Sequence, residues 1–298
     1  MEIKDIWVLL SGVSDYIEDI TKKLPSELLE NFKPILIEKT QVVIDNENNV
    51  RIFYDNKEQK IPQFFWPAMT NTDSYSFEKI LIEAGAQSIL NVNDVAAMRS
   101  KTVSYARLAK NGIRIPKSLI FFEKSDKKRI TETFEYPFVI KPDNGTGGAG
   151  VMLIHNDAEL DEYMENLTGS VTYIAQEYIA SSKGRDLRVV MLGGKTLYAM
   201  ERKAATADEF RSNVHLGGTQ TAVDIDEDTN TICKKIAGLY DLDLIGIDLL
   251  YSQDGFIVAE VNSFPGIIGE FVPFLSTAAQ YVIANFIEKK KNSMKDDR

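Results

Sequence analysis

The chain has 298 residues and an acidic balance, with 34 Lys and Arg against 44 Asp and Glu, a formal net charge of −10 and a pI near 4.9. This charge argues against nucleic acid as the main partner, although an acidic protein can still bind ATP through a local cluster of basic residues and metal. One cysteine, Cys233, excludes an internal disulfide, and two histidines, His155 and His215, exclude a His-rich zinc site.

The N-terminal third is predicted to be a small α/β domain. It begins with early acidic residues rather than a sustained apolar run, so we expect no signal peptide, and no window of the chain reaches the length of a membrane span. Strands are predicted at residues 3–10, 35–37, 42–44, 50–54 and 64–66, and helices at residues 16–24 and 77–84. Together with the single cysteine, these features predict a soluble, cytoplasmic protein.

Two further lobes are predicted after this domain, and the chain is long enough to bury a large core. The first lobe starts with one helix from an N-cap at Asn93 to Asn111, with Gly112 as its C-cap. Its strands are predicted at residues 120–122, 138–141, 151–154 and 173–176, with a short helix between the first two strands and a helix near residues 157–166. The second lobe has strands at residues 187–191 and 196–201, a helix at 229–240 that buries Cys233, and a last helix at 278–287. The predicted domains are residues 1–95, 96–177 and 178–290, followed by a charged tail of residues 291–298.

A hairpin is predicted between residues 244–251 and 256–262, with Ser252 to Gly255 as the turn. We expect a three-residue loop with Gly255 left-handed, so that Ser252 pairs with Phe256. This register places Asp248 opposite Glu260 and Gly246 opposite Asn262.

The two faces of this hairpin differ in character. Alternation of side chains makes one face apolar and gathers Asp248, Glu260 and Asn262 at one end of the other face. Two facing carboxylates repel each other unless a cation or a proton lies between them. An all-oxygen set is what Mg²⁺ prefers, with phosphate oxygens completing its shell. A divalent-metal phosphate site is the working hypothesis, and a solvated polar face is the alternative.

A glycine-rich loop matches the pattern G-x-G-x-x-G at Gly145, Gly147 and Gly150. A dinucleotide fingerprint requires a helix after the loop, whereas residues 151–154 are predicted to form a strand. Strand, glycine loop and strand are instead typical of a flap whose N–H groups cover phosphates. Lys141 ends the preceding strand and is well placed for phosphate oxygens, the alternative being a lysine at a sheet edge. Lys101 lies on a helix, where the sequence alone indicates only a solvated charge.

A polar segment from Arg211 to Gly218 ends in glycines. By itself it is a loop with positive charge. Beside a metal site, however, an arginine is the expected stabiliser of a transferring phosphoryl group. His215 is interpreted as structural rather than as a general base.

The order and spacing of these motifs resemble those of ATP-grasp ligases, most closely the RimK type, the α-L-glutamate and amino-acid ligases. The resemblance rests on Lys141-Pro142 with its glycine loop and on residues 176–179, 183–188, 211–213 and 260–262, and it covers roughly residues 90–288. It implies an α/β (α+β) fold of three lobes, with an N-terminal Rossmann-like pre-ATP-grasp domain and with ATP held between the second and third lobes.

Site residues follow from the resemblance by position. ATP would be bound by Lys101, Lys141, Gly145, Gly147, Gly148, Glu177, Tyr178, Ile179, Asp186, Arg211, Ser212 and Asn213. Arg211 and Asn213 would face the γ-phosphate and the acyl group as catalytic residues. Asp248, Glu260 and Asn262 would hold two Mg²⁺ ions, with Mn²⁺ as a substitute.

The implied reaction joins a carboxylate to an amine through an acylphosphate, with release of ADP and phosphate. Glutamate is the commonest donor of the family, its acceptors include peptides, protein tails and small amines, and a dimer or tetramer is the expected assembly. A phosphotransferase and a non-catalytic nucleotide-binding module are the alternatives. Two departures from the family pattern, Leu216 and Phe264, concern the substrate rather than the ATP chemistry.

Overall fold

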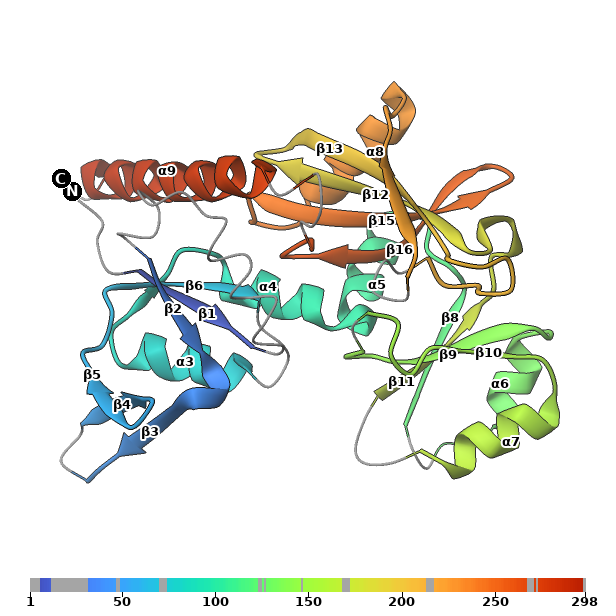
Figure 1. Cartoon of the computed structure of the whole chain (residues 1–298), viewed down its shortest axis with the longest axis horizontal. Helices are drawn as coiled ribbons and strands as arrows, with labels where there is room; N and C mark the ends of the chain where they lie inside the picture. Colours follow the sequence, from blue (N-terminus) through green and yellow to red (C-terminus); the bar gives the residue numbers. More distant parts are fainter. Residues whose placement is uncertain are drawn as a thin grey trace. The chain divides into compact units, whose positions relative to one another are not determined.

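The computed structural model describes residues 6–11, 32–46, 49–69, 74–122, 125, 127–145, 147–167, 172–212, 217–266, 271 and 273–296. The chain divides into two compact units (Figure 1). The first comprises Met1–Ala96, Tyr240–Leu244 and Ser263–Arg298, and the second comprises Ala97–Leu239 and Ile245–Asn262. The predicted boundary between residues 177 and 178 stays a prediction, because both flanking segments lie in the second unit.

The first unit is built on a four-stranded parallel sheet of order β2-β1-β6-β7. Its strands are β1 (Ile6–Leu10), β2 (Phe32–Leu36), β6 (Phe64–Met69) and β7 (Gln87–Ser88). Apolar runs such as Ile6–Leu10 suit a sheet that is buried on both faces. Helix α3 (Tyr75–Glu83) packs Phe77 and Leu81 into this core, and Gly85 ends it with a φ of 96°.

Two other elements complete the first unit. An antiparallel sheet contains β3 (Thr40–Ile44), β4 (Val50–Tyr54) and β5 (Lys57–Gln59), after the 3₁₀ turn η1 (Ile37–Lys39). Helix α9 (Pro273–Asp296) is longer than the predicted residues 278–287, and its Phe286 packs edge-on against Phe64. The predicted helix at residues 16–24 lies outside the described residues. No helix in the described part of the chain combines the length and apolarity needed to cross a membrane.

The second unit contains an antiparallel sheet of order β10-β9-β11-β8. The strands are β8 (Ser118–Phe122), β9 (Phe138–Pro142), β10 (Met152–Ile154) and β11 (Thr172–Glu177). Helices α6 (Lys128–Thr133) and α7 (Asp157–Glu165) cover one face (Figure 1), where Ile130 and Leu160 join the core around Phe138. The opposite face carries Lys141.

The predicted single helix over residues 93–111 is wrong, because two helices occupy this stretch. Helix α4 (Val92–Arg99) and helix α5 (Lys101–Lys110) are separated by Ser100, whose backbone is extended with φ −96° and ψ 110°. Asn91, rather than Asn93, accepts hydrogen bonds from the first N–H groups of α4. Ser100 caps α5 by accepting a bond from the Val103 N–H, and Gly112 follows α5 in a left-handed conformation.

A five-stranded sheet of order β14-β13-β12-β15-β16 forms the rest of the second unit. Its strands are β12 (Arg185–Leu192), β13 (Lys195–Lys203), β14 (Thr219–Ala222), β15 (Leu244–Ser252) and β16 (Gly255–Asn262). The 3₁₀ turn η3 (Ala180–Ser182) precedes it, and helix α8 (Glu227–Ala237) buries Cys233 completely. Burial raises the pKa of the Cys233 thiol to about 12, which fits the predicted role of a small hydrophobe.

The hairpin of β15 and β16 has the expected pairing at its functional end, but the predicted turn is wrong. Asp248 lies opposite Glu260 and Gly246 opposite Asn262. Ser252 pairs with Gly255 rather than Phe256, so the turn has one residue fewer than expected. The register shifts between Asp248 and Leu249, which leaves Ala259 as a bulge residue and restores the expected pairs.

Candidate active site

Lys101, the first residue of helix α5, contacts both the glycine loop and the hairpin. Its Nζ donates to the Gly145 carbonyl at 2.6 Å and to the Asp143 carbonyl at 3.3 Å. The same atom lies 3.3 Å from Glu260 Oε1 and forms an ion pair with it. Because Lys101 is only 9% exposed, it is not the solvated charge that the sequence alone indicates.

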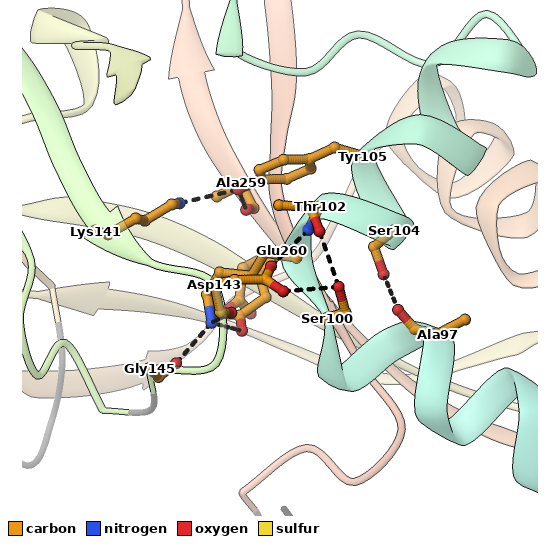
Figure 2. Close-up of polar contacts among 12 residues, drawn as sticks. Ala97, Ser100, Thr102, Ser104, Tyr105, Lys141, Asp143, Gly145, Ala259 and Glu260 are labelled. Atoms are coloured by element: carbon orange, nitrogen blue, oxygen red, sulfur yellow. Dashed lines mark hydrogen bonds and ion pairs between the residues drawn. The ribbon is translucent and has the colours of Figure 1, made fainter. Parts of the chain in front are cut away.

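Asp143 ties the start of the glycine loop to the first turn of α5. Its two carboxylate oxygens accept hydrogen bonds from the Ser100 hydroxyl and the Thr102 backbone N–H, each at 2.8 Å (Figure 2). A helix N-terminus favours a carboxylate, because its first N–H groups have no partner within the helix. This anchor fixes the loop beside Lys101.

Lys141 is connected to the hairpin through Tyr105. Its Nζ donates to Tyr105 Oη at 2.9 Å, and this hydroxyl donates to the Ala259 carbonyl at 2.6 Å (Figure 2). Ala259 is the bulge residue of β16. The bulge is therefore also the place where the Tyr105 side chain of α5 is hydrogen-bonded to the hairpin. The chain thus holds both lysines of the predicted ATP site at one end of the hairpin.

The glycine loop joins two antiparallel strands, β9 and β10, as the sequence predicts. Gly147, Gly148 and Gly150 have φ values of 61°, 81° and 71°, in the left-handed region that favours glycine. At Gly145 a Cβ would lie 2.9 Å from Pro142 Cγ and 3.0 Å from the Ala149 carbonyl, so a side chain does not fit there.

Arg211 contacts the glycine loop from the segment between β13 and β14. Its Nη1 donates to the Gly148 carbonyl at 3.1 Å, and its other nitrogens form a two-bond pair with Glu209 at 2.8 and 2.9 Å. Hydrogen bonds from Arg211 lower the pKa of Glu209 to about 2. Ser212 follows within the described residues, whereas Asn213, His215 and Leu216 lie outside them.

Asp248 lies in a buried network of two carboxylates and two guanidinium groups. Arg188 donates from Nε to Asp248 Oδ1 and from Nη2 to Oδ2, both at 2.7 Å. Arg202 Nη2 donates to Asp248 Oδ2 at 2.9 Å, and Arg202 also forms a two-bond pair with Asp186. Both carboxylates are therefore neutralised within the chain.

Burial alone would raise the pKa of the Asp248 carboxyl, which is 4% exposed. The positive charges of Arg188 and Arg202 and their hydrogen bonds outweigh this effect, so the pKa is lower than in an exposed aspartate. The Asp248 carboxyl is therefore ionised at neutral pH.

Asp248, Glu260 and Asn262 offer oxygen donors at the same end of the hairpin. Asn262 Nδ2 is buried and has no hydrogen-bond partner among the described residues. No hydrogen bond from this nitrogen therefore fixes the orientation of the Asn262 amide group. In the described part of the chain no three His, Cys, Asp or Glu side chains gather as metal ligands, and the predicted set has only two carboxylates. Its all-oxygen chemistry fits a hard divalent cation whose remaining ligands come from a phosphate.

The predicted hinge residues begin at Glu177, the last residue of β11. The Glu177 carboxylate accepts a hydrogen bond from the Lys117 N–H at 3.2 Å. The ring of Tyr178 packs edge-on against Phe210, and burial raises its pKa, while Ile179 leads into η3. Phe264 lies in the first unit, where its ring packs against Trp66.

Sequence reasoning missed the partners of the predicted residues, namely Tyr105, Asp143, Arg188, Arg202 and Glu209. One signal was present, because Asp186 and Arg188 are two residues apart on a strand and so share a face. Arg202 joins them because it lies opposite Asp186 in the register of β12 and β13. That register could not be read from the sequence, since a shift between Val190 and Met191 changes the pairing.

Residues 98–292 match the model of the RimK-like ATP-grasp domain. The chain belongs to this family. This ATP-grasp chain is 33% identical over 248 residues to a probable alpha-L-glutamate ligase 1 of Shewanella denitrificans, a match over 80% of the chain and 82% of the relative. It is 35% identical over 177 residues to the ribosomal protein bS6–L-glutamate ligase of Escherichia fergusonii, 59% of each chain.

Two solved structures share the ATP-grasp fold. A D-alanine–D-alanine ligase from Bacillus anthracis, complexed with ATP, matches with a TM-score of 0.72 at 16% identity, over 98% of this chain and 100% of that one. A RimK domain ATP-grasp protein from Sphaerobacter thermophilus matches with a TM-score of 0.67 at 14% identity, over 95% and 98% of the two chains. The predicted α/β ATP-grasp fold is confirmed.

Membership of the RimK-like ATP-grasp family makes the chain an ATP-dependent ligase that forms an amide bond. The phosphotransferase and the non-catalytic binding module are not favoured. ATP-grasp ligases use ATP together with divalent metal ions, and the acidic end of the hairpin fits this requirement.

Proposed function

We propose that this ATP-grasp ligase activates the carboxylate of an amino acid as an acylphosphate and transfers the acyl group to an amine. One observation carries the proposal. The Lys101 ammonium group contacts the glycine-loop carbonyl of Gly145 at 2.6 Å and the hairpin carboxylate of Glu260 at 3.3 Å. Lys101 therefore brings the proposed phosphate-binding loop and the proposed metal-binding carboxylate to one side chain, which supports a site for a metal–nucleotide complex.

The nucleotide binds, in this proposal, on the face of the β10-β9-β11-β8 sheet that carries Lys141. Cross-strand pairing places Lys141 beside Ile174, and Ile174 beside Ile120, which is 46% exposed. Ile174 is completely buried, so Ile120 is the apolar neighbour that suits an adenine ring, with the hinge of Glu177, Tyr178 and Ile179 at the strand end. Lys101, Lys141, Ser212 and the N–H groups of Gly145, Gly147 and Gly148 then face the phosphates. Glu177 or its neighbours lie near the ribose, and Asp186 belongs to the nucleotide site.

Asp248, Glu260 and Asn262 would hold the divalent cations, proposed as two Mg²⁺ ions that Mn²⁺ can replace. When bound, such cations neutralise charge on the phosphate oxygens. Arg211 already contacts the glycine loop at Gly148, which supports a role for Arg211 at the γ-phosphate. The resemblance to the family suggests the same role for Asn213.

The reaction has two steps. A carboxylate oxygen of the donor attacks the γ-phosphorus, the bond between this phosphorus and the β,γ-bridging oxygen breaks, and ADP leaves. The amine then attacks the acyl carbon, and the bond to the phosphate-bearing oxygen breaks. The nitrogen loses one proton, which the released phosphate takes up, and the amide remains. The glycine loop would exclude water, because an acylphosphate exposed to water hydrolyses.

The name of the Shewanella relative supports glutamate as the donor, and the Escherichia relative supports a protein tail among the acceptors, beside peptides and small amines. The single buried cysteine fits the cytoplasm, where ATP and Mg²⁺ are supplied.

Product analysis tests this proposal. The chain is incubated with Mg-ATP, a panel of amino acids and candidate amines, with Glu260→Gln as the blank. We expect ADP, phosphate and a product heavier than the acceptor by one amino-acid residue. A phosphorylated acceptor would indicate a kinase, and AMP would contradict an acylphosphate.

A further inference from the structure

Both carboxylates of the proposed metal set face cations that belong to the chain itself. Asp248 accepts three N–H donors, one on Oδ1 from Arg188 and two on Oδ2 from Arg188 and Arg202. Glu260 faces the Lys101 ammonium group at 3.3 Å. Side chains of the chain itself therefore neutralise the two carboxylates that a divalent cation would contact.

The geometry leaves Asp248 little room for a further ligand. A carboxylate offers about four lone-pair positions, two on each oxygen, so Oδ2 is fully used and Oδ1 keeps one. A divalent cation at that position would lie beside two guanidinium groups, whose repulsion is only weakly screened because Arg202 is 6% exposed. Binding of a free cation must break at least one short ion pair or accept this repulsion.

We propose that Arg188 and Lys101 act as gates that keep Asp248 and Glu260 closed to free divalent cations until a nucleotide polyphosphate arrives. Phosphate oxygens compete for guanidinium and ammonium groups, and their release exposes the carboxylates. Metal and nucleotide then bind together, each raising the affinity for the other by the same factor. This inference rests on the metal set of the proposed function.

Arg188 and Arg202 differ in the number of hydrogen bonds that they donate to Asp248. Arg202 gives two bonds to Asp186 and one to Asp248, whereas both bonds of Arg188 go to Asp248. Removal of Arg188 leaves Asp248 ionised and still paired with Arg202. Arg188 is therefore the positioning residue to change.

The test measures binding of Mn²⁺ to the full chain without nucleotide, by electron paramagnetic resonance. Arg188→Gln and Lys101→Gln are each expected to bind Mn²⁺ at least tenfold more tightly than the unmodified chain. Arg185→Gln is the matched control, because Arg185 lies on the same strand and stacks on the Tyr251 ring instead of reaching Asp248. The control is expected to bind Mn²⁺ as the unmodified chain does.

Circular dichroism shows whether each variant folds. If Arg188→Gln does not fold, Lys101→Gln decides the outcome. Unchanged Mn²⁺ affinity in the folded gate variants would overturn the inference. Asp248→Asn and Glu260→Gln are measured with Mn²⁺ and a non-hydrolysable ATP analogue. If both bind this complex normally, the proposed metal set is wrong and the inference falls with it. If both lose binding while the gate variants bind free Mn²⁺ normally, only the inference is overturned.

Discussion

Asp248 and Glu260 are opposite each other in one hairpin, yet the protein holds the two carboxylates differently. Asp248 is buried and accepts three N–H groups from two arginines. The Glu260 side chain is 32% exposed and faces a single lysine. The same loss of charge should therefore have different effects on stability at the two positions.

We expect Asp248→Asn to lower the free energy of unfolding by about 3 kcal/mol, because it removes one partner of a buried ion network and leaves the guanidinium charges less compensated. Glu260→Gln should cost less than about 1 kcal/mol, as for a partly exposed pair. Both variants should lose turnover. Urea unfolding measures the difference, and equal losses of stability would contradict the assigned network.

Lys101 shows how far residue-level prediction reaches. Its sequence context is a helix that begins after a serine, which carries no signal of burial. Only the fold brings the Gly145 carbonyl and the Glu260 carboxylate, 44 and 159 positions along the chain, within reach of the Lys101 ammonium group. Its role was implied by family resemblance alone.

At the scale of elements, the sequence correctly predicts the pairing of Asp248 with Glu260 in the hairpin, although the turn length from which this pairing is argued is wrong. A three-residue turn without a bulge and a shorter turn with a bulge at Ala259 give the same distal pairs. The sequence does not distinguish these two turns, because a bulge adds one residue to the strand and so offsets the loss of one residue from the turn. Similarly, Ser100, where the helix is interrupted, donates a hydrogen bond to Asp143, which lies 43 positions away.

The glycine loop allows a controlled test at this scale. Gly147 and Gly194 both have left-handed backbones, with φ values of 61° and 74°, and a Cβ would meet nothing within 4 Å at either. Substitution by alanine should therefore cost each variant a similar 1–2 kcal/mol or so of stability, the cost of a left-handed L-residue. Gly194 lies in the turn between β12 and β13, at the opposite end of this strand pair from Lys203, after which the Arg211 segment begins.

Only Gly147→Ala should impair ATP use, because this residue belongs to the proposed phosphate flap. We expect KM for ATP to rise and kcat to fall about tenfold or more, with Gly194→Ala unchanged in both constants. Steady-state kinetics at saturating donor and acceptor measure the effect. Equal kinetics in the two variants would argue against a flap.

For the whole molecule, the ordered motifs predicted the fold because each motif belongs to a different element of the second unit. The loop after β9, the hinge after β11 and the end of β16 must meet for any one of them to act on ATP. The arginine network was not predictable in this way. Arg188 contacts Asp248 because their strands, β12 and β15, are neighbours in the sheet. The local sequence of a strand does not predict which strands lie beside it.

The central claim is that this ATP-grasp site activates a carboxylate as an acylphosphate, and isotope transfer tests it most directly. The donor amino acid, identified by product analysis, is labelled with ¹⁸O in its carboxylate and incubated with Mg-ATP and acceptor amine. The mechanism requires the oxygen that attacks the γ-phosphorus to leave with phosphate. We predict one ¹⁸O atom in each phosphate released, and none when Glu260→Gln is used. Amide formation with unlabelled phosphate, or with label in AMP, would contradict the account.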